Sequence, residues 1–399
     1  MENIPFLEEL NIQQKAACIE EKNLLLKACP GSGKTRTLTY KLAYLVTKYE
    51  CSNKLNIAIT YTNRAAEEIS ERLEKLGIAS NKIWVGTIHQ FCLEFIIRPY
   101  TIYHKRLNKG YHIIDEYIAG KYISAIAKEL NISIKYGKNP LDNPNIAEKY
   151  HNKLLTEREL DFDSILSVAN ELLHQNEFIA ENIAGIVRAI LVDEYQDTNL
   201  VQETILEMLS EKDNNTLFTV GDVKQSIYRF RQARPDLFLR RNEKYHNEEE
   251  GVSIELRDNF RSAPGVLCFT NYVFSRLMER DFGGVDYNEE TALRAGEGGP
   301  MLEDKETSEL LFFVKDSVQT LEEAPEDVLT ETALITKRIQ ELIEEGYHYG
   351  DIVILLRSGA GRMEPMAEFL EKNGIPVSCE NKTGYFHTRE ITIILNYLS

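Results

Sequence analysis

Residues 24–38, LLLKACPGSGKTRTL, combine an apolar run, a glycine-bearing loop and the start of an amphipathic helix. Gly31 and Gly33 allow backbone N–H groups to point at an anion, and the N-terminus of the following helix adds a partial positive charge. The loop has the phosphate-binding pattern, with Ala28 in place of its first glycine. We therefore predict a strand, a phosphate loop containing Gly31, Ser32 and Gly33, and a helix.

A second motif supplies the acids that such a loop needs. Lys34 is expected to reach the β- and γ-phosphates of a nucleotide, and the Thr35 hydroxyl to bind Mg²⁺. In AILVDEYQDTN, residues 189–199, an apolar strand ends in two acids. Asp193 suits a magnesium ligand and Glu194 a base that takes a proton from water. Each motif alone also occurs in ordinary turns, but both at strand ends in one sheet predict a nucleoside-triphosphate hydrolase.

Short apolar runs alternate with helical patterns through the first two thirds of the chain. The predicted strands are nearly continuous in apolar character, as expected for strands buried on both faces of a parallel sheet; they cover residues 24–28, 56–62, 83–88, 189–194, 217–222 and 252–257. Helices are predicted at 33–49, 63–76 and 200–210. The alternation predicts a doubly wound α/β fold of the P-loop NTPase class, with ligands at the carboxyl ends of the strands.

Two segments depart from this alternation. Residues 92–180 are predicted to be a helical insertion into a first motor domain made of 1–91 and 181–262. After Pro264 we expect a helix and an acidic, glycine-rich linker, GEGGP. A second, incomplete α/β unit then follows within 263–399, with strands at ELLFFV, DIVILLR and IPVSCE, a long helix to Gly346, another at 363–373 and a last helix at the end.

Composition excludes several classes of protein. No run approaches eighteen apolar residues and the N-terminus lacks a signal-peptide pattern, which predicts a cytoplasmic protein without a membrane partner. The six cysteines form no metal-ligand or disulfide pattern. The net charge of −17 is concentrated between Asp286 and Asp327, where thirteen acids face three bases. Between Arg98 and Arg158 eleven bases outnumber six acids, so this segment is a candidate for phosphate contact.

Further motifs give the chain a family resemblance. DEYQD, VGDVKQSIYRFRQA (220–233) and LRDNFRSAPGVL (256–267) resemble those of the UvrD/Rep group of superfamily 1 helicases. LNIQQKAA, AITYTNRAAEEISERL, VGTIHQFC, LDFDSIL, DIVILLRS and GYFHTREI match further motifs of that group in the same order. The resemblance implies a RecA-like motor that uses ATP and Mg²⁺ to move 3′ to 5′ along single-stranded or partial-duplex DNA.

The resemblance also implies roles for single residues. Gln14 would read the adenine edge, with Arg36 and Phe260 beside the nucleotide. Gln225 would sense the γ-phosphate, and Arg261 would act as an arginine finger. Contacts to single-stranded DNA are implied for Tyr61, Thr62, Asn63, Thr87, His89, Tyr228 and Phe230. Core packing is the alternative for the aromatic residues, and a satisfied loop histidine is the alternative for His89.

Two finer likenesses lead to two hypotheses. From about residue 190 the wording is closest to the larger, helicase-bearing chain of the bacterial helicase–nucleases of DNA repair and recombination. The first half is closer to the helicase-like B subunit of Gabija anti-phage systems. The chain is therefore expected to be either a DNA translocase or a non-motor subunit that senses nucleotide and DNA and docks on a nuclease partner. No segment resembles the later helicase motifs, so we expect weak ATPase activity and no robust unwinding from residues 1–399.

Cys29 lies inside the phosphate loop. A thiol at the N-terminus of a helix can have a lowered pKa, which would make Cys29 a redox-sensitive site. The alternative is a small filler beside Pro30.

Overall fold

The computed structural model describes residues 4–78, 81–134, 139–210, 215–228, 232–246, 250–280, 285–300, 308–312, 326–359 and 361–379. The chain divides into two compact units, Met1–Thr307 and Ser308–Ser399. Phe230, the motif GYFHTREI and the helix expected at the end of the chain lie outside the described residues.

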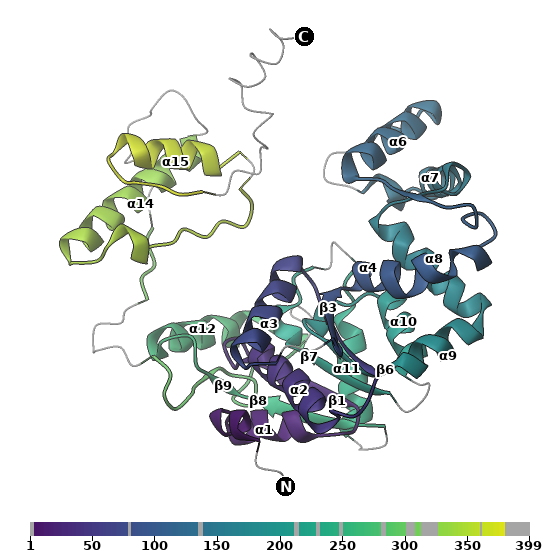
Figure 1. Ribbon diagram of the computed structural model, residues 1–399. Coiled ribbons are helices and arrows are strands. Elements are labelled where there is room, and N and C mark those ends of the chain that lie inside the picture. The colour runs from purple at the N-terminus through teal and green to yellow at the C-terminus, as the bar shows by residue number, and fades with distance from the viewer. Residues whose placement is uncertain are drawn as a thin grey trace. The chain divides into compact units, whose positions relative to one another are not determined.

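A parallel sheet of six strands is the centre of the first unit (Figure 1). The strand order is β3-β2-β6-β7-β1-β8. The strands are β1 (Leu24–Ala28), β2 (Leu55–Thr60), β3 (Ile83–Thr87), β6 (Val187–Val192), β7 (Thr216–Gly221) and β8 (Val252–Leu256). All six predicted strands are confirmed, within two residues at each end.

Helices cover both faces of this sheet because alternate strand residues point to opposite sides. Leu24 and Leu26 of β1 pack in one core cluster, whereas Leu25 packs in the other. The first cluster contains residues of α1 (Ile12–Ile19), α2 (Lys34–Lys48) and α3 (Asn63–Lys75). The second contains residues of α8 (Phe162–Gln175), α9 (Glu177–Ile186), α10 (Leu200–Ser210) and α11 (Pro235–His246). This arrangement confirms the doubly wound α/β fold.

The insertion after β3 is mainly helical, as predicted. Its helices are α4 (Ile88–Phe91), a π-helical turn (Cys92–Ile97), α5 (Arg98–Tyr100), α6 (Glu116–Glu129) and α7 (Pro144–Glu157). The sequence missed two short strands, β4 (His112–Ile113) and β5 (Glu159–Leu160), which pair in parallel. Ile126 of α6 and Ile146 of α7 belong to a separate small core, so this helix pair has its own apolar centre.

The segment after β8 returns to the phosphate loop. It contains β9 (Asp258–Asn259), α12 (Pro264–Leu277) and β10 (Arg294–Ala295), and β9 and β10 pair in parallel. Residues 263–307 pack within the first unit, although the sequence pattern assigns them to the second motor domain. The extents of the two motor domains therefore stay a prediction.

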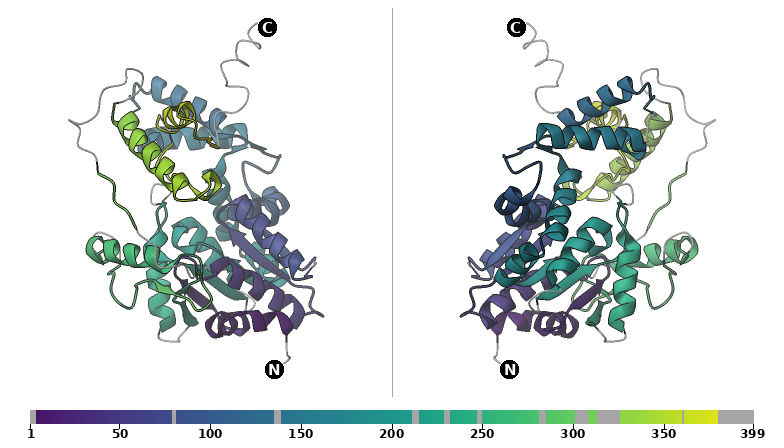
Figure 2. Two further views of the ribbon diagram at one scale, coloured as in Figure 1. Left: turned by 90° about the vertical axis from the view of Figure 1, so that its left-hand side faces the viewer. Right: turned by 90° about the vertical axis from the view of Figure 1, so that its right-hand side faces the viewer.

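In the second unit, α14 (Glu326–Glu344) and α15 (Met363–Lys372) pack against each other through Ile339, Met366 and Leu370 (Figure 2). The two helices confirm the sequence pattern, but the strands expected at DIVILLR and IPVSCE are absent from the described part of this unit. A strand requires a paired neighbour. Here Ile352, Ile354 and Val377 instead pack on the apolar helix cluster. Among the described residues, no helix is both long and apolar enough to cross a bilayer.

Short 3₁₀ turns complete the described structure. Those used below are the turn at Tyr195–Asp197, which follows β6, and the turn at Val223–Gln225, which follows β7. The others are Pro5–Glu9, Thr101–Tyr103, Pro140–Asp142 and Tyr349–Asp351.

Lys41 of α2 is a charged residue in the core beneath the sheet, with only 1% of its surface exposed. Its ammonium group donates to the Glu20 carbonyl at the end of α1. Burial lowers the pKa of Lys41 from 10.5 to about 8, with Cys18 and Glu20 opposing this shift. Between these two pH values the unfolded chain holds a proton that the folded chain has lost. Stability therefore rises with pH through this window and is constant with respect to Lys41 below it.

We expect Lys41→Met to remove this pH dependence, which amounts to roughly 3 kcal/mol between pH 8 and 10.5. Urea unfolding can be followed by Trp84, the single tryptophan, which lies in β3 of the first unit. The matched control is Lys48→Met, because Lys48 is on the same helix with 32% of its side chain exposed. Equal pH slopes for Lys41→Met and the wild type would contradict this account.

Candidate nucleotide and nucleic-acid site

The phosphate loop connects β1 to α2, as the sequence predicts. Gly33 has a φ of +85° and precedes the first helical residue, Lys34. The backbone N–H and the hydroxyl of Ser32 both donate to the Cys29 carbonyl, at 3.2 and 2.7 Å. Gln14 donates its side-chain N–H to the Ser32 carbonyl at 3.0 Å. The loop is thus closed on itself and tied to α1.

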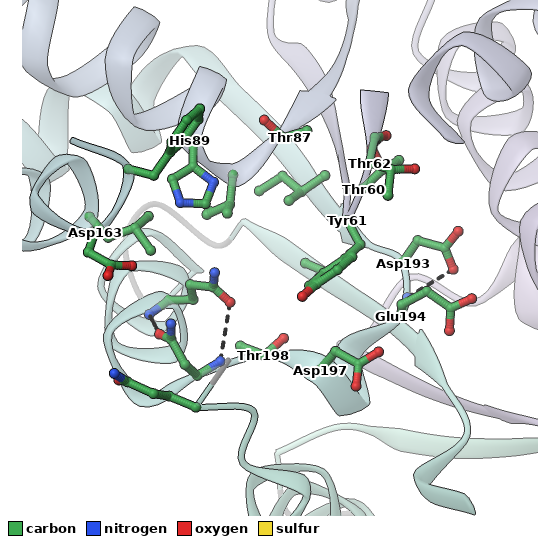
Figure 3. A pocket seen from close by; sticks show the side chains of 18 of the residues that line it. Thr60, Tyr61, Thr62, Thr87, His89, Asp163, Asp193, Glu194, Asp197 and Thr198 are labelled. Atoms are coloured by element: carbon green, nitrogen blue, oxygen red, sulfur yellow. Dashed lines mark hydrogen bonds between the residues drawn. The ribbon is translucent and has the colours of Figure 1, made fainter. Parts of the chain in front are cut away.

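The paired acids lie at the end of β6 and meet the phosphate loop. The Lys34 ammonium group lies 2.8 Å from Oε2 of Glu194, across 160 positions of sequence. Figure 3 shows the carboxylates of Asp193 and Glu194 beside each other at the strand end. The two motifs therefore form one site.

Asp193 is the buried acid of the pair, with 6% of its surface exposed. Burial, followed by the Glu194 carboxylate, raises the pKa of Asp193 to about 6. Glu194 has a φ of +50°, a left-handed conformation that costs a non-glycine residue on the order of 1 kcal/mol. Its backbone N–H donates to Oδ1 of Asp193 at 3.0 Å. Because Mg²⁺ prefers oxygen ligands and would offset the poorly compensated charge of Asp193, these residues fit a magnesium site together with Thr35.

A second loop closes over the phosphate loop from the side of β9. Asn259 donates its side-chain N–H to the Pro30 carbonyl at 2.6 Å, and the Phe260 N–H donates to the Gly31 carbonyl at 2.9 Å. Oδ1 of Asn259 accepts from the Arg261 N–H at 2.8 Å. This places Arg261 next to the phosphate loop, where an arginine finger is predicted.

Gly31 permits this close approach. A Cβ at position 31 would lie 2.8 Å from both Cβ of Arg261 and Cγ of Asn259, at a φ of +71°. We expect Gly31→Ala to weaken ATP binding at least tenfold, because the side chain would push the Asn259–Arg261 loop away.

Gly77→Ala is the control, since Gly77 also has a φ of +71° but no atom within 4 Å of the added Cβ. Both variants carry the backbone strain of about 1 kcal/mol, whereas only Gly31→Ala adds the steric conflict. Titration with a fluorescent ATP analogue measures the difference. Equal affinities for the two variants would show that the loop contact is unimportant.

The remaining nucleotide residues lie near the loop but contact protein groups. Arg36 donates to the carbonyl of Glu9 at 3.1 Å and to its carboxylate at 3.3 Å. The Phe260 ring occupies the space beside Gly296. Gln225 donates to Oδ2 of Asp222 at 3.0 Å. The contacts of Gln14, Arg36, Phe260 and Gln225 with a nucleotide stay predictions.

The residues for which DNA contacts are predicted converge on a cavity of about 510 Å³ in the first unit. It is lined by Tyr61, Thr62, Asn63, Thr87 and His89 from the ends of β2 and β3, and also by Asp193 and Glu194. Figure 3 shows Tyr61 between His89 on one side and the two acids on the other. Tyr61 and Tyr228 are half-buried and stacked, with ring centroids 4.9 Å apart. The described DNA residues thus share a cavity rim with the nucleotide site.

Comparisons with known proteins decide the family. The model of the UvrD/REP helicase N-terminal domain matches residues 10–143 and 128–246, and that of the UvrD-like helicase C-terminal domain matches 254–399. The chain belongs to the UvrD-like helicase family. Its six-stranded parallel sheet with a phosphate loop is the RecA-like fold of these helicases.

Relatives within the UvrD-like family are named as the A subunit of an ATP-dependent helicase/nuclease. The protein of that name from Bacillus pumilus is 42% identical over 230 residues, covering 52% of this chain and 19% of the relative. Those from Alkaliphilus oremlandii and Listeria welshimeri are 35% and 34% identical, over 63% and 64% of this chain and 22% of each relative. The chain spans about a fifth of the length of these relatives. The likeness of the first half to the Gabija protein stays a prediction.

Gln196 is a site residue of this UvrD-like chain that our sequence reasoning missed. Its side-chain N–H donates to Oε2 of Glu194 at 2.7 Å, and its side-chain oxygen accepts from the Asp222 N–H at 3.0 Å. A Cβ on Gly221 would lie 2.2 Å from that oxygen, so only glycine fits there. Gln196 therefore links the acid at the end of β6 to the turn after β7. The glutamine in DEYQD was the available signal.

Cys29 follows the filler alternative. Its thiol donates to the Arg257 carbonyl at 3.2 Å, and burial raises the pKa of Cys29 to about 11. A thiol in this state is a poor nucleophile at neutral pH, which argues against the redox-sensitive site.

Proposed function

We propose that this chain is the ATP-hydrolysing motor portion of a DNA helicase or translocase that binds single-stranded DNA. The observation that supports this most directly is the 2.8 Å contact between Lys34 and Glu194. It unites the phosphate loop and the acid pair beside a cavity rimmed by residues for which DNA contacts are predicted. The similarity to proteins named as ATP-dependent helicase/nucleases agrees with this proposal.

The chain's own residues divide the hydrolysis among them. The loop N–H groups and Lys34 hold the phosphates, while Asp193 and Thr35 would hold Mg²⁺, which neutralises phosphate charge when bound. Glu194 would accept a proton from the attacking water, with Gln196 orienting its carboxylate. Arg261 would stabilise charge that develops on the transferred phosphoryl group.

A link from nucleotide to DNA is offered by the turn after β7. Asp222 and Ser226 both bond to Gln196, which in turn bonds to Glu194. The same turn leads to Tyr228, which stacks on Tyr61 at the cavity. A shift of Glu194 on nucleotide binding would thus be passed to the aromatic pair through few contacts. Movement from 3′ to 5′, a role in DNA repair and a nuclease partner are further parts of the proposal.

The test is ATP hydrolysis by residues 1–399 with and without a single-stranded oligonucleotide. A motor should be accelerated at least tenfold by saturating oligo(dT), and DNA binding should weaken steeply as salt is raised. An unchanged rate despite salt-dependent DNA binding would favour a non-motor sensing protein. Hydrolysis without any DNA binding would exclude both.

A further inference from the structure

The chemistry of the cavity is unusual for a surface that meets DNA. Its described lining contains five carboxylates, at Glu116, Asp163, Asp193, Glu194 and Asp197, and neither Lys nor Arg. Carboxylates repel phosphate, so the described lining is unsuited to the DNA backbone. The lining also contains side-chain amides and hydroxyls, which form hydrogen bonds with the edges of bases.

One acid in the cavity has an unused acceptor atom. Asp197 is 7% exposed, and its Oδ1 atom is buried without a hydrogen-bond partner among the described residues. Burial, followed by the Glu194 carboxylate, raises the pKa of Asp197 to about 6. A buried acceptor of this kind gains from a ligand that brings N–H groups.

The end of the cavity away from the nucleotide offers an aromatic surface. His89 and Phe162 meet edge to face with ring centroids 5.6 Å apart, and 53% of Phe162 is exposed. Burial lowers the pKa of His89, so the imidazole is neutral and contributes no positive charge. Asp163 follows Phe162 in the first turn of α8, and Figure 3 shows its carboxylate on the same side of the cavity as His89. An aromatic face beside a carboxylate can stack a base and accept from its amino group.

We propose that this cavity takes a nucleobase of single-stranded DNA while the phosphates stay outside, and that it favours bases with an exocyclic amino group. Phe162 supplies the stacking surface and Asp163 accepts from the amino group. The inference rests on the proposed function and adds to it a preference among DNA sequences. Asp193 and Glu194 also line the cavity but belong to the nucleotide site, so Asp163 is the acid through which the preference can be tested separately.

The test compares 15-mers of deoxycytidine and deoxyuridine, whose bases differ only in an amino group against a carbonyl oxygen. Fluorescence anisotropy at pH 7.5 without nucleotide should show the cytosine oligomer binding about fivefold more tightly. Asp163→Asn should bring the ratio close to one, because an amide accepts from cytosine and donates to uracil equally well. Asp163→Glu should retain part of the preference.

A matched control uses Glu181→Gln, an exposed acid on α9 outside the cavity, which should keep the wild-type ratio. Phe162→Ala should weaken both oligomers and reduce quenching of 2-aminopurine placed within the 15-mer, and Phe162→Tyr should restore both. Phe178→Ala, also a partly exposed aromatic but outside the cavity, should change neither. Trp84 fluorescence confirms that each variant is folded.

Three results would overturn the inference. Equal wild-type affinities for the two oligomers would exclude the amino preference. A preference that survives both Asp163→Asn and Phe162→Ala would place the base elsewhere. If neither oligomer bound the wild-type chain, the proposed function itself would fail, and this outcome is distinct from equal but measurable binding.

Discussion

Glu194→Gln is expected to lower ATP turnover by about 10²- to 10⁴-fold while leaving ATP affinity within about threefold of the wild type. Glutamine retains an oxygen that can accept from Lys34 and from Gln196, so the geometry at the end of β6 is preserved. It cannot accept a proton from water. The loss should therefore appear in the maximal rate rather than in nucleotide binding.

Steady-state hydrolysis and equilibrium binding of a fluorescent ATP analogue separate these two effects. Glu67→Gln, an exposed exchange of the same type on α3, should change neither quantity. If turnover by Glu194→Gln stays within threefold of the wild type, Glu194 is not the base. A parallel loss of ATP affinity would instead assign Glu194 a binding role.

Arg241→Met is expected to destabilise the first unit by about 3–5 kcal/mol. Arg241 of α11 lies 2.5 Å from Oε1 of Glu203 on α10, and both are almost fully buried. The Tyr195 hydroxyl donates to the same oxygen at 2.6 Å, and the Arg241 guanidinium lies over the Tyr195 ring. Removing Arg241 would leave the Glu203 carboxylate buried beside a single hydroxyl. The free energy of unfolding in urea, read from Trp84, measures this cost.

Arg240→Met provides the neighbouring control. Arg240 has 68% of its side chain exposed and pairs with Asp236 one turn away, so its loss should cost less than about 1 kcal/mol. The double variant Arg241→Met with Glu203→Leu should recover most of the stability, because it removes the orphaned charge. Equal stabilities of Arg241→Met and Arg240→Met would show that the buried pair contributes nothing specific. Tyr195 follows Glu194 directly, so this network also supports the catalytic turn.

The first unit was predictable from the sequence wherever the signal is local. The strand from Leu24 to Ala28 and the helix that begins at Lys34 follow from an apolar run, two glycines and a helix-forming pattern within fifteen residues. The helix at Asn63 begins where the Thr62 side chain accepts from the Ala65 N–H, and Gly77 follows its end with a φ of +71°. The second unit gave a mixed result. Ile352 and Val377 have the character of strand residues, but their segments lie against α14 and α15 without a ladder among the described residues.

By itself, then, the sequence determined the elements of the sheet, the phosphate loop and the identity of the paired acids, because each depends on residues close together in the chain. Only the tertiary structure decided which of them meet. The order β3-β2-β6-β7-β1-β8 is not the order of the chain, and it brings Gln196 against Gly221 and Lys34 against Glu194. Strand order depends on how two helical layers pack over the whole sheet, which no local pattern records. The Arg241–Glu203 pair and the acid-lined cavity arise from the same packing.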